Sequence, residues 1–366
     1  MKILYIPGRY AFCYYHRGYL PGVYSGQMVI NEFVRTNGLK TDITEIQDLA
    51  KKADVVVMQR PTDVEHIELV KWLKLNDKKV IFENDDTYDV DKSLHLNQLK
   101  TQEAKDLFIQ LSNNVKKILP MCDGAIASTE MLGKEYAQYN NNVAVLKNCI
   151  DPLDEYECKK NNTGKFRVGL VGSVTSNNDY EHIKDQIRQL DERGDVTIVV
   201  MGVKYPNGQY SKTMQKDHDF WSSLKNIEWH PYVPTLEYMM TVASLALDLA
   251  IIPREESYFN KCKSNLKYLE MSLLKIPVLA QAFSTGDGPY DTGCAHINLV
   301  SDNSTWYNKI VEIKDNHSKY VEQAVMAHDF VLENYNIKTY AIEWTKTIER
   351  LVSSESEKNQ MTQVQN

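Results

Sequence analysis

An alternation of short apolar runs with amphipathic helical segments is the feature that most constrains the fold of this chain. Apolar runs without polar alternation are typical of parallel strands covered on both faces, and helical segments between them are typical of βα units. The first half therefore predicts the opening of a parallel α/β domain. Its expected strands are residues 2–7, 53–61, 78–85 and 124–129, and its expected helices are residues 64–76 and a segment that opens near Gly26 and runs through residues 28–38.

The alternation breaks in the polar segment CKKNNTGK, residues 158–165, whose composition is typical of a linker. It then restarts, which predicts two doubly wound, Rossmann-like α/β domains over residues 1–157 and 165–335. Ligands bind beyond the carboxyl ends of the strands in such sheets, so function is expected between the two lobes. The expected elements of the second half are strands at 166–173, 196–202 and 245–253 and helices at 180–193, 263–274 and 340–352.

Composition excludes several classes of protein. The 366 residues, 43% of them hydrophobic, suffice for two cores, and a formal charge of -7 gives no basic field for nucleic acid. The chain contains no run of about 18 apolar residues, and its first residues, MKILYIPG, are too short an apolar segment for a secretory signal, so none is expected. Its six cysteines show no CxxC pattern and no zinc spacing, which favours free thiols in a reducing cytoplasm over disulfides or a structural metal. Residues 353–366 have the composition of a disordered tail.

The expected helix at 263–274 carries charges on one side. About 100° per residue places Lys263, Lys267 and Glu270 on one stripe, with leucines roughly opposite. Ser264 is placed to cap the helix, and a helix N-terminus offers unpaired N–H groups to an anion. The two lysines fit a diphosphate, and the glutamate fits ribose hydroxyls. An ordinary solvated face with a Lys–Glu pair is the alternative.

The segment LDLAIIPREESYFNKCKSNLKYLEMSLLKIPVLAQ, which contains this helix, resembles the donor-binding segment of GT-B glycosyltransferases, the retaining kind related to bacterial surface-polysaccharide enzymes. Further similar stretches are GYLPGVYSGQ, ADVVVMQRP, VIFENDD, NCIDP and VGLVGS. The resemblance implies two Rossmann-like domains that face a cleft, with a C-terminal helix, residues 336–352, crossing back to the first domain. It also implies that residues 165–335 bind a nucleotide-diphosphate sugar and that residues 1–157 bind the acceptor.

Carried onto this chain, the resemblance places Lys263, Ser264 and Lys267 at the diphosphate and Glu270 at the ribose. Many retaining members carry a second glutamate where this chain has Cys262, so recognition of the sugar hydroxyls must differ here. The donor-binding residues that the resemblance implies are Gly172, Ser173, Tyr232, Arg254, Lys263, Ser264, Lys267 and Glu270.

Residues 8–26 and the acidic stretch FENDDTYDVD, residues 82–91, are the candidate acceptor side. A glycine-rich loop after a strand lets the backbone approach a ligand, and aromatic rings stack on sugars. A packed loop and a solvated acidic turn are the alternatives. The expected acceptor-side residues are Gly8, Arg9, Arg17, Arg60 and Asp85.

The main catalytic task is the stabilisation of charge on a departing nucleotide diphosphate, which we assign to Lys263 and Lys267. Enzymes of this architecture generally use lysines and a helix dipole for this task, so no metal and no cofactor besides the donor is expected. If the reaction inverts configuration, His16 or Asp86 is the candidate base.

The expected function is transfer of a sugar to a hydroxyl of a glycan, a lipid-linked or a protein acceptor, with retention and without metal. Peripheral contact with a membrane stays open, because lipid-linked acceptors are common among similar enzymes. Three alternatives also stay open: transfer to modified bases in DNA, nucleotide-sugar epimerisation, and a non-catalytic scaffold of the same fold.

Overall fold

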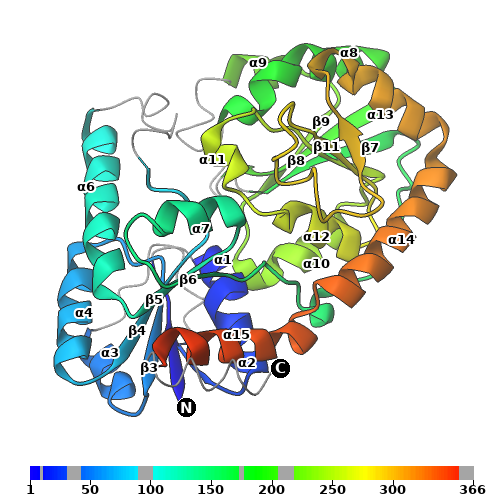
Figure 1. The fold of residues 1–366 in the computed structure, drawn as a ribbon. Helices are drawn as coiled ribbons and strands as arrows, with labels where there is room; N and C mark the ends of the chain where they lie inside the picture. Colours follow the sequence, from blue (N-terminus) through cyan, green and yellow to red (C-terminus); the bar gives the residue numbers. More distant parts are fainter. Residues whose placement is uncertain (9–10, 31–42, 90–101, 173–176, 205–217, 354–366) are drawn as a thin grey trace. The chain divides into compact units, whose positions relative to one another are not determined.

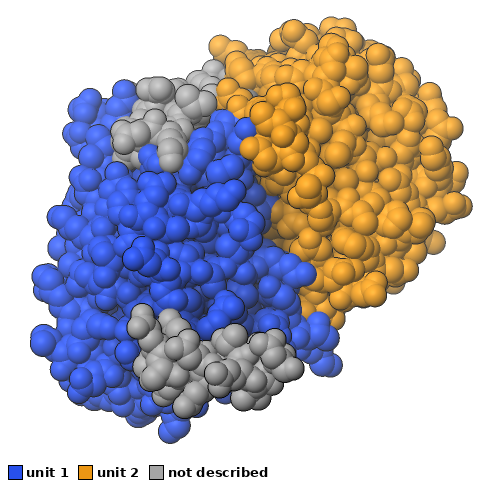
Figure 2. Space-filling view, in the orientation of Figure 1, with its two compact units in different colours: residues 1–149, 257–264, 337–366 blue, residues 150–256, 265–336 orange. Residues whose placement is uncertain are grey.

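The computed structural model describes residues 1–8, 11–30, 43–89, 102–172, 177–204 and 218–353. The chain forms two compact units, which Figure 2 shows in different colours. The first boundary falls after Cys149, earlier than the expected end at residue 157, and a short segment of the second half folds with unit 1. Unit 1 comprises Met1–Cys149, Ser257–Ser264 and Ile337–Asn366, and unit 2 comprises Ile150–Glu256 and Asn265–Asn336.

Unit 1 contains a six-stranded parallel sheet in the order β2-β1-β3-β4-β5-β6 (Figure 1). The four strands expected from apolar runs are present, because those runs supply residues that are buried on both faces of the sheet. The strands are β1 (Ile3–Ile6), β2 (Met28–Val29), β3 (Val55–Gln59), β4 (Lys79–Asn84), β5 (Gly124–Ala127) and β6 (Val143–Val145).

Successive strand residues alternate between two faces, and each face of this sheet has its own core. Val56 and Phe82 belong to one core, and Val57 and Ile81 belong to the other, which the C-terminal helix covers. The described helices of unit 1 are α1 (Ala11–Tyr14), the π-helix η1 (Tyr15–Tyr19), α2 (Leu20–Tyr24), α3 (Ile43–Ala50), α4 (Val64–Leu75), α6 (Gln102–Ile118), the 3₁₀-helix η2 (Leu119–Met121), α7 (Glu130–Tyr136), α11 (Tyr258–Lys261) and α15 (Ile337–Val352).

The segment after β1 differs from the expectation. The helix expected to open near Gly26 is wrong at its start, because Met28 and Val29 form strand β2 and pair with Leu4 and Tyr5 of β1. The rest of that expected helix lies outside the described residues. The helical turns lie earlier, in α1, η1 and α2, within the stretch that was interpreted as a glycine-rich loop.

Unit 2 contains a second six-stranded parallel sheet, in the order β12-β11-β10-β7-β8-β9. Its expected strands are confirmed. The strands are β7 (Phe166–Val171), β8 (Val196–Lys204), β9 (Ile227–Pro231), β10 (Leu249–Ile252), β11 (Val278–Gln281) and β12 (Asn298–Val300).

One core of unit 2 packs Val168 and Ile198 of the sheet against Ile187 of α8 and against Trp306 and Ile310 of α13. The α-helices of unit 2 are α8 (Lys184–Arg193), α9 (His218–Ser223), α10 (Tyr238–Ser244), α12 (Leu266–Leu273), α13 (Trp306–Asp315) and α14 (His317–Asn334). The 3₁₀-helices of unit 2 are η3 (Pro152–Asp154), η4 (Asn177–Ile183), η6 (Thr235–Glu237) and η7 (Asn303–Thr305).

Helix α15 returns to unit 1 after α14 of unit 2, as the resemblance implied. It packs against α2, β5 and β6. Trp344 and Ile348 lie in the same apolar cluster as Ile3 and Tyr5 of β1. The last helix of the chain therefore completes the core of the first strand.

Candidate active site

Each sheet has one switch point, a position between two neighbouring strands whose onward connections run to opposite sides of the sheet. In unit 1 this point lies between β1 and β3, and in unit 2 it lies between β7 and β10. Ligands of doubly wound sheets bind at such points, beyond the carboxyl ends of the strands. Gly8 and Arg60 follow β1 and β3, whereas Gly172 and Arg254 follow β7 and β10. Four of the expected site residues therefore lie at the two switch points.

Gly8 lies directly against the backbone at the end of β3. A Cβ atom at this position would collide with the carbonyl oxygens of Gln59 and Arg60. Arg60 itself has a φ of 52°, which a residue with a side chain rarely adopts, and its N–H donates to the carbonyl oxygen of Glu83 at 2.7 Å. Backbone strain of this kind concentrates at functional sites.

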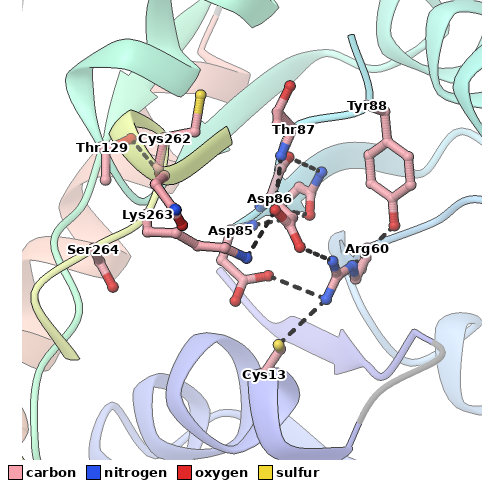
Figure 3. A network of polar contacts seen from close by, with 12 residues as sticks. Cys13, Arg60, Asp85, Asp86, Thr87, Tyr88, Thr129, Cys262, Lys263 and Ser264 are labelled. Carbon is pink, nitrogen blue, oxygen red and sulfur yellow. Dashed lines mark hydrogen bonds and ion pairs between the residues drawn. The ribbon is translucent and has the colours of Figure 1, made fainter. Parts of the chain in front are cut away.

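The guanidinium of Arg60 organises the charges at this end of the sheet (Figure 3). It pairs with Asp86, lies 3.9 Å from Asp85 Oδ1, and donates to Tyr88 Oη at 2.9 Å and to Cys13 Sγ at 3.4 Å. Burial opposes the charge, but Tyr88 and Asp86 outweigh it and raise the pKa of Arg60 well above its ordinary value. Arg60, Asp85 and Asp86 therefore form one charge cluster at the ends of β3 and β4.

Lys263 joins this cluster. Its Nζ lies 2.9 Å from Asp86 Oδ1, which also accepts the N–H of Thr87 at 3.1 Å (Figure 3). The expected stripe of Lys263, Lys267 and Glu270 on one helix is wrong, because α12 begins at Leu266 and Lys263 lies before it. The cluster then holds two cationic side chains, Arg60 and Lys263, and two carboxylates, Asp85 and Asp86, so its formal charges balance.

Ser264 does not cap α12, because Asn265 is the N-cap residue and makes no side-chain capping bond. The hydroxyl of Ser264 instead accepts a hydrogen bond of 2.7 Å from Asn148 Nδ2. Asn148 belongs to the NCIDP stretch, so that stretch anchors the residue that precedes the N-cap of the helix.

The segment Ser257–Ser264 is held in unit 1 by further contacts. Tyr258 Oη donates to Glu135 Oε2 at 3.0 Å, and Thr129 Oγ1 donates to the carbonyl oxygen of Cys262 at 3.1 Å. Cys262 is fully buried in the core of unit 1, and burial raises the pKa of its thiol. Cys262 is therefore a core residue and does not substitute for a sugar-binding glutamate.

His16 and Arg17 lie inside unit 1 on the π-helix η1. His16 is buried, and its Nδ1 lies 3.3 Å from the carbonyl oxygen of Cys149. Arg17 is completely buried, donates to Glu83 Oε1 at 2.6 Å, and lies over the ring of Trp344. Both side chains are therefore buried inside unit 1 and held there by contacts with the protein.

Lys267 and Glu270 meet on α12 in unit 2, together with a residue that the sequence analysis missed. Lys267 Nζ lies 3.1 Å from Glu270 Oε2 and donates to Tyr238 Oη at 2.7 Å, and Tyr238 Oη donates to Glu270 Oε2 at 3.2 Å. Burial and the Glu270 carboxylate raise the pKa of Tyr238 well above its ordinary value, so the phenol stays protonated at neutral pH.

Gly172 closes this cluster at the end of β7. Its φ is 122°, and a Cβ atom there would collide with the end of the Lys267 side chain. The glycine thus lets the ammonium group lie against the backbone at the switch point of unit 2, where the sequence analysis expected a phosphate.

Arg254 is held by Asp179, which lies in η4 of unit 2. Its Nη1 donates to Asp179 Oδ2 at 2.8 Å, and the N–H of Glu255 donates to Asp179 Oδ1 at 3.1 Å. Tyr232 follows β9 and is 38% exposed. Arg9, Ser173 and the tail from residue 354 lie outside the described residues.

The described part of the chain shows neither a metal site nor a membrane-spanning helix. No group of three or more His, Cys, Asp or Glu side chains there is placed to hold a metal ion. No described helix is both long and apolar enough to cross a membrane.

No protein-family model matches the sequence, and no curated protein matches it. Solved structures are similar over almost the whole chain. HepE of Anabaena, solved with UDP and glucose, is 12% identical and has a TM-score of 0.65, with 95% of this chain and 99% of that chain covered. Sucrose-phosphate synthase of Thermosynechococcus elongatus is 10% identical, with a TM-score of 0.63 and coverage of 96% and 99%. A glycosyltransferase of Rickettsia africae is 11% identical, with a TM-score of 0.63 and coverage of 97% and 99%.

These likenesses define a protein of two parallel α/β domains, each with a doubly wound sheet. The particular fold is GT-B.

Proposed function

We propose that this chain is a glycosyltransferase that binds a nucleotide-diphosphate sugar on unit 2 and transfers the sugar to an acceptor hydroxyl. The observation that carries the proposal is the cluster of Lys267, Tyr238 and Glu270 against Gly172 at the β7/β10 switch point. The GT-B fold and the structures of HepE with UDP and glucose and with UDP-glucose support the choice of donor class.

Lys267 is the proposed ligand of the diphosphate. Its ammonium group is partly exposed, lies 3.1 Å from Glu270 Oε2 and donates to Tyr238 Oη at 2.7 Å. A diphosphate carries more negative charge than one carboxylate and competes for this cation. Because the chemical step builds charge on the departing diphosphate, a prepositioned ammonium group stabilises the transition state.

Glu270 is the proposed ligand of the ribose. Its carboxylate is buried, with the side chain only 2% exposed, and Tyr238 donates to the same oxygen that Lys267 contacts. If Lys267 moves from Glu270 to a bound diphosphate, Glu270 Oε2 becomes able to accept a hydrogen bond from a ribose hydroxyl. Tyr238 keeps its hydrogen bond and holds the carboxylate in place during the exchange.

The acceptor is assigned to unit 1, where Arg60, Asp85 and Asp86 gather beyond the β1/β3 switch point. The acceptor is a hydroxyl of a glycan, a lipid-linked or a protein substrate. Asp86 belongs to this cluster, whereas His16 lies against the carbonyl oxygen of Cys149, so Asp86 is the better candidate for a group that orients or deprotonates the acceptor. Lys263 lies 2.9 Å from Asp86 Oδ1 and belongs to the same charge cluster of unit 1.

We further propose that the reaction retains configuration and needs no metal. Lysine and backbone N–H groups suffice to bind the leaving diphosphate, and in a retaining reaction the diphosphate itself can take the proton from the acceptor. An epimerase of the same fold would bind the same donor but would need no acceptor.

The test is binding and turnover of UDP-, GDP-, CMP- and dTDP-sugars, with and without a divalent metal. A ligand of the native state raises its melting temperature by mass action. Lys267→Ala should weaken donor binding about 10- to 100-fold, as expected for a charged hydrogen bond of about 1.5–3 kcal/mol. The matched control is Lys309→Ala, which removes an i,i+3 lysine that pairs with Glu312 at 2.9 Å on α13 and should leave binding unchanged.

Mass spectrometry of the products separates the candidate functions. Release of the nucleotide with a glycosylated acceptor supports the transferase, and an isomerised sugar on an intact nucleotide supports an epimerase. Absence of binding to every nucleotide sugar would overturn both and leave the non-catalytic scaffold.

A further inference from the structure

A cluster of buried polar side chains lies on the face of the unit 1 sheet that α15 covers. Gln59 of β3 and Glu83 of β4 are register partners, and each lies two residues beyond an apolar residue of that face, Val57 or Ile81. Neighbouring strands are about 4.8 Å apart, so the two side chains are adjacent. Arg17 reaches the pair from η1 and donates to Glu83 Oε1 at 2.6 Å.

Several polar atoms of this cluster have no hydrogen-bond partner in the described part of the protein. Arg17 Nη2, Glu83 Oε2 and both amide atoms of Gln59 are buried and have no hydrogen bond to any described residue. The side chains are almost completely buried: Arg17 and Glu83 are 0% exposed and Gln59 is 1% exposed. Buried polar groups nearly always have partners, because an unmade bond leaves the cost of removing the group from water uncompensated.

The chemistry of these atoms defines the guest that they can bind. Arg17 Nη2 and Gln59 Nε2 need an acceptor, whereas Gln59 Oε1 and ionised Glu83 Oε2 need a donor. A hydroxyl group does both, and it also suits a protonated Glu83. A neutral hydroxyl also adds no charge to the cluster, whereas an additional ion would have to be removed from water into a fully buried place.

We propose that Arg17, Gln59 and Glu83 bind ordered water at the carboxyl ends of β3 and β4. Buried waters typically make about three hydrogen bonds to groups that the protein leaves unpaired. Water, and not a larger hydroxylated ligand, fits the burial of all three side chains. The π-helix η1 supplies the wide turn from which Arg17 enters the cluster.

The bound water supports the segment that carries Lys263. Arg17 Nη1 donates to Asn148 Oδ1 at 3.1 Å, and Asn148 Nδ2 donates to Ser264 Oγ at 2.7 Å. A continuous chain of side-chain contacts therefore runs from the hydrated cluster to Ser264. The water adds a hydrogen bond to Arg17, which contacts Asn148, and Asn148 in turn contacts Ser264, the residue that follows Lys263.

The test is a high-resolution crystal structure of the full chain. Compact density within about 2.7–3.2 Å of the Gln59 amide and of Glu83 Oε2 is the expected result. A direct hydrogen bond between Gln59 Nε2 and Glu83 Oε2, with no density beside them, would overturn the proposal. The same crystals soaked in methyl glucoside distinguish the source of the hydroxyl: a sugar hydroxyl at this position would overturn water as the guest and give the site to an acceptor.

Two further measurements keep the proposal testable if a variant does not fold. In the wild-type protein, the Gln59 side-chain amide should show a nuclear Overhauser effect to a long-lived water, whereas exposed Gln102 should not; absence of that effect at Gln59 counts against the proposal. In Gln59→Leu crystals, the density beside residue 59 should disappear. The outcome is independent of donor binding, because none of these residues belongs to unit 2.

Discussion

The ammonium group of Lys263 lies 2.9 Å from Oδ1 of Asp86, so a lysine from the second half of the sequence completes a charge cluster of unit 1. Their side chains are 23% and 13% exposed. A pair this poorly hydrated is screened less by solvent than a surface pair, and removal of one partner leaves the other charge poorly compensated. Asp86 therefore determines where Lys263 lies.

Asp86→Asn should lower the free energy of unfolding by about 1–3 kcal/mol, because Arg60 and Lys263 lose a charged acceptor. Urea unfolding measures this change. The matched control is Asp48→Asn, whose partner Lys51 lies at 2.7 Å in an exposed pair of unit 1, and which should unfold like the wild type. Equal effects of the two substitutions would show that the Asp86 pair is energetically an ordinary surface pair.

Tyr238→Phe should weaken donor binding about 2- to 10-fold, because one hydrogen bond that orients Lys267 and Glu270 is worth about 0.5–1.5 kcal/mol. Isothermal titration with the donor identified in the screen provides the measurement. Tyr307→Phe is the control, since the phenol of Tyr307 accepts a hydrogen bond of 3.2 Å from Arg193 and lies away from the Lys267 cluster in the chain's α13 helix. Unchanged affinity of Tyr238→Phe would remove the positioning role of the phenol.

Gly172→Ala should reduce donor binding more than it reduces stability, because the new methyl group occupies the place of the Lys267 ammonium group. Gly164→Ala is the control for backbone strain. Gly164 also has a positive φ, 75°, but a Cβ atom there meets nothing within 4 Å. Donor titration and thermal unfolding of both variants separate the two effects, and parallel losses in both variants would point to strain alone.

Glu83 should make the stability of the protein fall as pH rises. Burial raises the pKa of Glu83 to about 8, against the opposing charge of Arg17. Between the ordinary pKa of glutamate, about 4.3, and pH 8, the native state then holds a proton that the unfolded state has lost, so deprotonation favours unfolding. The slope is at most about 1.4 kcal/mol per pH unit for one proton.

Glu83→Gln removes this proton and should flatten the dependence between about pH 5 and pH 8. Urea unfolding across that range is the measurement. A wild-type protein whose stability rises with pH in this window, and a Gln variant that removes the rise, would mean that Arg17 keeps Glu83 ionised.

Local patterns predicted most of the fold. Apolar runs such as VVVMQ, residues 55–59, became strands because a parallel sheet covered on both faces needs such residues. The stretch after β1 was misinterpreted because its glycines suggested a loop. In the structure, Gly18 packs against Tyr14 and Gly22 against Tyr5, and both rings lie in the core between the sheet and α15. Whether such a stretch forms a loop or packed helical turns depends on tertiary contacts, which the local sequence does not show.

The candidate site was predictable only in part. Gly172 and Asp86 were named as candidates because they follow strands, whose ends meet at one edge of a parallel sheet. Lys263 and Lys267 were placed on one helix, yet Lys263 pairs with Asp86, a residue 177 positions away in the chain. Tyr238 gave no signal, because one tyrosine in an amphipathic helix looks like any core residue.

The return of α15 to unit 1 has a consequence for biosynthesis. Trp344, Ile348 and Leu351 cover a face of the sheet whose strands all lie within the first 149 residues. The strands leave the ribosome well before α15, residues 337–352, has been synthesised. Until then the nascent sheet exposes an apolar face. Such surfaces are where chaperones bind and where aggregation begins.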